Sequence, residues 1–129
     1  MARFRRDPHD PIILSTLPHF VTLYFSRSHM GYSTIVFLSS SASVFWHRTI
    51  ESKEDPLYEI DHGLAAIWGA YDVVLALWYF KYSVIALNIL NLALYHASAN
   101  SKNYHTAHSL WHLFSSAKSI LVAYILFVR

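Results

Sequence analysis

The sequence contains no cysteine and unusually few charged residues. Without cysteine, a disulfide-stapled scaffold is excluded. Charged residues make up 14% of the 129 positions, whereas soluble domains carry about 25%, so these charges could not coat a water-soluble domain this small. The hydrophobic content of 54% excludes disorder, and a formal charge of +2 is too small to indicate a nucleic-acid partner. What remains is a small integral membrane protein.

Apolar stretches separated by charge clusters and helix breakers predict the spans, which run over residues 12–25, 32–47, 60–80, 83–97 and 105–128. The first is short and contains Pro18, so it crosses only if it tilts or kinks. The sequence therefore predicts an all-α, multi-pass helical bundle with about five transmembrane helices, or four if the first is interfacial. It forms a single transmembrane domain over 1–129, in which 1–10 is a polar N-terminal arm. Nothing indicates which membrane holds it.

Nine histidines are many for so apolar a chain, and the topology places several on one membrane face. His47 ends the second stretch, Asp61 begins the third, and His108 and His112 begin the fifth. Alternate spans run in opposite directions, so all of these residues are expected near the same face. The distribution of Lys and Arg places the N-terminus, and with it this face, on the cytoplasmic-type side.

The histidine spacing predicts a metal site. His108 and His112 are four residues apart and therefore project from one face of a helix on adjacent turns. A third imidazole from His47 would complete a three-histidine zinc site with an open fourth position, as in catalytic zinc centres. Simpler interpretations exist: histidines at span ends can be interfacial, Ser43 can be a packing residue, and Asp61 can cap its helix.

The combination of these residues resembles the CREST superfamily of membrane hydrolases, which includes the alkaline ceramidases and the progestin and adipoQ receptors. The shared pattern is a serine one turn before a histidine, an aspartate early in the next helix, and a histidine pair opening the last helix. Here it reads Ser43 to His47, then Asp61, then His108 to His112. The family has seven membrane helices, whereas this chain has room for about five. A homo-oligomer or a partner subunit could replace the missing cavity wall.

The resemblance implies a zinc-dependent hydrolase that cleaves an amide or ester bond of a long-chain membrane lipid, as a ceramidase does. It implies that His47, His108 and His112 bind Zn²⁺, that Asp61 serves as general base for a water, and that Ser43 donates a hydrogen bond to that water or to the developing oxyanion.

Two other functions remain open on the sequence alone. A structural or haem-binding subunit of a membrane complex could use His47 with His112, or His96 with His19, as axial ligands. A zinc-binding pseudoenzyme or receptor would keep the ligands without turnover.

The sequence also allows predictions for polar residues outside the expected site. Asp72 and Lys118 should reach a similar depth and form a buried ion pair. His62 and His105 flank the expected site, either as partners of its residues or, as we favour, as interfacial residues. The residues expected to be peripheral are His9, His19 and His29.

Overall fold

The computed structural model describes residues 5–128, and every regular element among them is helical. The predicted all-α class is confirmed. Of the polar arm predicted over 1–10, residues 1–4 lie outside the described part of the chain. The elements are α1 (Pro11–Leu14), the 3₁₀ helix η1 (Leu17–Val21), α2 (Thr22–Ser26), α3 (Met30–Arg48), α4 (Pro56–Trp78), α5 (Tyr82–Ala99) and α6 (Tyr104–Phe127).

The first predicted span does not form one continuous helix. Residues 12–25 are divided among α1, η1 and α2, with the 3₁₀ segment around Pro18. Proline lacks the N–H that an α-helix requires and its ring clashes with the preceding turn, which accounts for the break. Asp10 caps α1, because its side chain accepts a hydrogen bond from the backbone N–H of Ile12.

The other four predicted stretches each form one long helix, α3 to α6, with ends within about four residues of those predicted. Asp55 caps α4 and is followed by Pro56 at the first helical position, where proline's missing N–H is no loss. His29 caps α3 by accepting from the backbone N–H of Tyr32. Side-chain caps thus begin α1, α3 and α4 where the chain leaves a polar connection.

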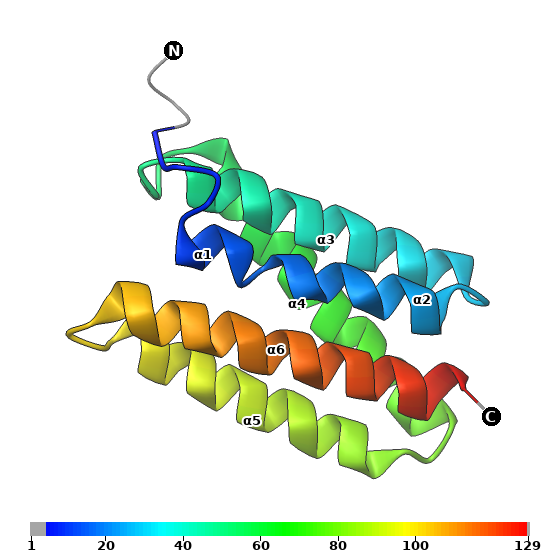
Figure 1. Cartoon of the computed structure of the whole chain (residues 1–129). Helices are drawn as coiled ribbons and strands as arrows, with labels where there is room; N and C mark the ends of the chain where they lie inside the picture. The colour runs from blue at the N-terminus through cyan, green and yellow to red at the C-terminus, as the bar shows by residue number, and fades with distance from the viewer. Residues whose placement is uncertain (1–4, 129) are drawn as a thin grey trace.

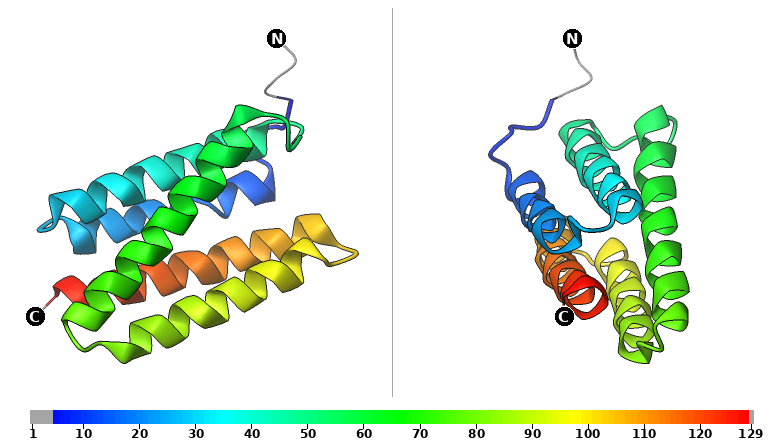
Figure 2. Two further views of the ribbon diagram at one scale, coloured as in Figure 1. Left: turned by 180° about the vertical axis from the view of Figure 1, so that it is seen from behind. Right: turned by 90° about the vertical axis from the view of Figure 1, so that its right-hand side faces the viewer.

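The long helices pack mainly as sequential neighbours, α3 with α4, α4 with α5, and α5 with α6. Figure 1 shows α1 and α2 lying in front of the bundle, between α3 and α6, while α4 crosses behind. The two views of Figure 2 agree that α4 crosses the other helices obliquely and closes that side. One buried cluster joins Tyr32, Val36 and Trp68. A second joins Ala76 to residues of α5 and α6.

Two helices, α4 and α6, are long and apolar enough to cross a membrane. Large apolar side chains such as Ile67, Val74 and Trp78 lie exposed on α4, where a lipid environment would cover them. These features are weak evidence for membrane association, and they do not establish the five-span, multi-pass arrangement expected from the sequence.

The predicted ion pair between α4 and α6 is confirmed. Lys118 Nζ lies 3.4 Å from Asp72 Oδ2, and both side chains are buried. Asn88 of α5 donates to the same carboxylate oxygen and accepts from Lys118, at 3.1 Å in each case. Tyr32 donates to the other carboxylate oxygen and itself accepts from Trp68 Nε1. This network joins α3, α4, α5 and α6 inside the bundle.

Candidate metal centre

Three histidines from two helices meet at one end of the bundle. His47 near the end of α3 and His108 and His112 in the first turns of α6 each offer a nitrogen, and these three atoms lie within 4.8 Å of one another. All three side chains are buried. His47 Nε2 and His112 Nε2 are 2.8 Å apart. The cluster predicted from spacing is therefore brought together.

The chain path explains this meeting. The α3–α4 connection, the α5–α6 connection and residues 5–10 of the N-terminal arm all lie at the same end of the molecule (Figure 1). The rings of His108 and His112 are 4.5 Å apart between centroids, as expected for positions one turn apart. His47 lies 4.7 Å from His112 by the same measure. The helix α6 thus supplies two imidazoles, and α3, which is far from it in the sequence, supplies the third.

The donor set suits a metal ion. Neutral imidazole nitrogens are common ligands of zinc and related ions, and in a tetrahedral zinc site the ligand nitrogens are about 3.3 Å apart. The separations here, from 2.8 Å to at most 4.8 Å, bracket that value.

Two of the three imidazoles have a hydrogen-bond partner on the nitrogen away from the cluster. His47 Nδ1 lies 2.8 Å from Glu51 Oε1, and His108 Nδ1 lies 3.2 Å from Ser98 Oγ. Histidine ligands of metals usually have such a partner, which fixes the orientation and tautomer of the ring.

Glu51 is the most connected residue around the cluster. Its Oε1 atom accepts from Arg6 Nη1 at 2.9 Å as well as from His47, and its Oε2 atom accepts from the Tyr104 hydroxyl at 3.2 Å. Burial would raise the pKa of Glu51, but the hydrogen bond and charge of His47, with Arg6 and Tyr104, lower it below its usual value. A carboxylate is therefore kept beside His47.

Ser43 and Asp61 join the histidines around one cavity of about 1090 Å³. Ser43 comes from α3 and Asp61 from α4, and the two side chains interact across the α3–α4 contact. The sequence-predicted residues thus all line the same space. The alternative interpretation of Asp61 as a helix cap is wrong, because α4 begins at Pro56 and is capped by Asp55.

Aromatic side chains form much of the remaining cavity wall. Trp46 and Trp111, which flank the ligands in sequence, both line it, as do Tyr58, Tyr95 and Tyr104. Tyr104 stacks on His108 at 4.8 Å between centroids. The Trp111 indole N–H donates to the backbone carbonyl of Asn91, which fixes that ring against α5. The cavity wall is therefore mostly apolar, and its polar groups include the histidine cluster, Ser43 and Asp61.

The expectation that His19 is peripheral is wrong. Its side chain is buried, lines the cavity, and lies edge-on to the ring of His112 at 6.2 Å. His19 Nδ1 donates to the carbonyl of Thr16, and its Nε2 is 3.3 Å from Ser115 Oγ. His19 lies in the 3₁₀ segment η1, which packs on α6.

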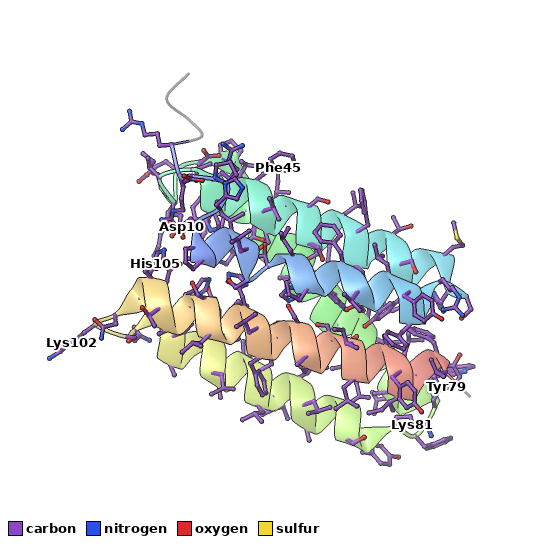
Figure 3. All side chains as sticks on the ribbon, viewed as in Figure 1. Asp10, Phe45, Tyr79, Lys81, Lys102 and His105 are labelled. Carbon is purple, nitrogen blue, oxygen red and sulfur yellow. The ribbon has the colours of Figure 1, made fainter. Side chains whose placement is uncertain are left out.

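The two flanking histidines differ in placement. His62 lies in the cavity wall, where its Nε2 is 3.1 Å from the Tyr95 hydroxyl and its Nδ1 is 3.6 Å from Asp61 Oδ2. His105 is turned away from the cluster toward the arm, with Nε2 2.6 Å from Asp10 Oδ1 (Figure 3). Burial would raise the pKa of Asp10, but the Ile12 N–H and His105 lower it below its usual value.

Sequence reasoning missed Glu51 and Ser98 as partners of the ligands. Glu51 follows His47 by four residues, but the helix ends at Arg48, so helical spacing gives no reason to pair them. Ser98 is ten residues before His108, in a separate helix. Only the packing of the two connections at one end brings these residues to the cluster.

No family model, curated protein or solved structure matches the chain. The site must therefore be interpreted from its own geometry. That geometry is a buried three-histidine cluster that could hold a metal ion, at the wall of a largely apolar cavity that also carries a serine and a carboxylate.

Proposed function

We propose that this chain is a zinc-dependent membrane hydrolase that cleaves an amide or ester bond of a long-chain lipid. The observation that carries the proposal is the convergence of His47, His108, His112, Asp61 and Ser43 on one apolar cavity. The residues and their order are those on which the resemblance to the CREST superfamily rests.

The three imidazoles would hold zinc and leave one coordination position open toward the cavity. Zinc, when bound, supplies two effects, a lowered pKa of a coordinated water and polarisation of a carbonyl. Asp61 accepts the proton that the attacking water loses and passes it to the leaving amine or alcohol. Ser43, which lines the same cavity as Asp61, donates to the oxygen on which negative charge develops.

The size and lining of the cavity support the proposal of a lipid substrate. Its volume of about 1090 Å³ is at the upper end of typical ligand pockets, and its aromatic wall favours an alkyl chain. Residues of α3, α4, α5 and α6 all line it, so the acyl chain would lie between helices. A second copy of the chain or a partner subunit could complete the wall.

Metal analysis of the detergent-purified protein tests the site first. We expect about one zinc per chain, lost in the variant His108→Ala and retained in His96→Ala. His96 is an exposed histidine, so its removal is a matched control. Full zinc occupancy in His108→Ala would contradict the ligand assignment.

Turnover is tested separately, by release of free fatty acid from a panel of N-acyl and O-acyl lipids. Hydrolysis that is abolished by a chelator and restored by zinc would support the enzyme. Stoichiometric zinc with no turnover across the panel would instead favour the pseudoenzyme or receptor.

A further inference from the structure

We infer that Glu51 is a positioning residue that fixes the tautomer and orientation of His47, so that the Nε2 lone pair of this histidine faces the cluster. The inference rests on the proposed metal site and adds to it a residue that the spacing of the ligands does not indicate. It follows from the hydrogen-bonding capacity of each group around the cluster.

The position of the proton on His47 follows from its partner. A carboxylate can only accept hydrogen bonds, so the 2.8 Å contact between Glu51 Oε1 and His47 Nδ1 requires the proton on Nδ1. In the neutral ring the Nε2 atom then carries the lone pair. Nε2 is the atom that lies 2.8 Å from His112 Nε2, within the cluster.

The same reasoning applies to His108, whose Nδ1 atom also has a hydrogen-bond acceptor. Ser98 has one hydroxyl proton, and it donates this proton to the carbonyl of Tyr95 at 2.8 Å. Ser98 Oγ therefore accepts from His108 Nδ1, which leaves the lone pair of His108 on Nε2. Two ligands from different helices are thus prepared for coordination through Nε2.

Glu51 is itself held in place from three directions. Arg6 binds the same oxygen as His47, and Tyr104 binds the other oxygen. Its backbone N–H donates to Thr49 Oγ1 at 3.0 Å. The carboxylate contacts come from the arm and from α6, so the carboxylate cannot turn away from His47 without breaking the bonds with Arg6 and Tyr104.

The backbone of Glu51 is also held in an uncommon conformation, as is that of Phe80 in the α4–α5 turn. Its φ of 56° lies in the left-handed region, which residues other than glycine seldom adopt. Such strain persists where the surroundings impose it, and it is concentrated at functional sites. A glycine would relieve the strain but could not supply the carboxylate, which accounts for a glutamate at this position.

The first test uses metal-free protein with ¹⁵N-labelled histidine, in which imidazole ¹⁵N shifts report which nitrogen of His47 is protonated. We expect Nδ1–H in the unsubstituted protein, and a mixture or Nε2–H in Glu51→Ala. The variant Glu51→Gln should keep Nδ1–H, because an amide oxygen can still accept there while the amide nitrogen faces Tyr104. Glu54→Ala, which removes an exposed glutamate from the same connection, is the matched control and should leave His47 unchanged.

The second readout is zinc affinity by competition with a chelator. Loss of an outer hydrogen-bond partner typically costs about 10- to 100-fold in metal affinity, so we expect a loss of that size in Glu51→Ala. Glu51→Gln should fall between Glu51→Ala and the unsubstituted protein, and Glu54→Ala should match the latter. If Glu51→Ala does not fold, a zinc affinity of Glu51→Gln below that of Glu54→Ala supports the inference, and equal affinities contradict it.

An unchanged His47 tautomer in Glu51→Ala, with zinc affinity within about twofold, would overturn the inference. So would a Glu51→Gln variant whose His47 loses the Nδ1 proton while the fold is retained. The tautomer measurement needs neither metal nor substrate, so failure of the hydrolase proposal and failure of this inference are separate results.

Discussion

The buried pair of Asp72 and Lys118 allows a quantitative test of the packing, through the variant Lys118→Met. Methionine fills a similar volume but leaves the Asp72 carboxylate without its cation. At the observed 3.4 Å and an effective dielectric constant of about 20, the attraction lost is about 5 kcal/mol. Removing one partner of a buried pair typically costs about 3–5 kcal/mol. Because Tyr32 and Asn88 still donate to Asp72, we expect a loss near the lower end, about 3 kcal/mol.

The assay is reversible unfolding in mixed micelles, followed by helical circular dichroism, on a double-mutant cycle. Asp72→Asn combined with Lys118→Met removes both charges and should recover about 2 kcal/mol relative to the sum of the single variants. Lys102→Met, which alters an exposed lysine in the α5–α6 connection, is the matched control (Figure 3). A Lys118→Met variant within about 0.5 kcal/mol of the unsubstituted protein, or strictly additive losses, would refute the reasoning.

Two further predictions concern the site and the arm. The variant Asp61→Asn should keep its zinc but lose lipid hydrolysis by at least about 100-fold, because it removes the proposed general base and no metal ligand; loss of zinc together with activity would argue against that division of roles. The pKa of Asp10 is lowered in the folded protein, in part by its contact with His105. The stabilisation that the Asp10 carboxylate provides is therefore fully present when the pH is above 3.8, the ordinary pKa of this group. It is lost as the pH falls through the lower pKa of the folded state. The melting temperature of Asp10→Asn should therefore lie below that of the unsubstituted protein at about pH 6, and the difference should shrink toward about pH 3.

Much of the fold could be predicted from the sequence, because charge clusters and prolines interrupt strongly apolar stretches. The four long helices, the all-α class and the meeting of His47 with His108 and His112 follow from spacing and from antiparallel connections. The ion pair of Asp72 and Lys118 follows from the equal rise of two helices. Each of these features depends on periodicity, which a single sequence reveals.

The features that were not predicted depend on irregular backbone. The inward turn of His19 results from the 3₁₀ segment at Pro18, and hydrophobicity alone suggested a span there. The contact of Glu51 with His47 requires a left-handed backbone conformation that no residue type at this position signals. The number of membrane crossings stays a prediction, since among residues 5–128 two helices, α4 and α6, meet the length and apolarity that a crossing needs.

The position of the histidine cluster between α3 and α6 has a mechanical consequence. These two helices make little direct contact in the described part of the chain, because α1, η1 and α2 lie between them and pack on both. Yet His47 and His112, 65 residues apart, approach to 2.8 Å. An ion held by both would act as a crosslink that ties the first half of the chain to the last helix, and its binding energy would add directly to the stability of the fold. Withdrawing the ion would then loosen the bundle at the end where the cavity and its polar groups lie.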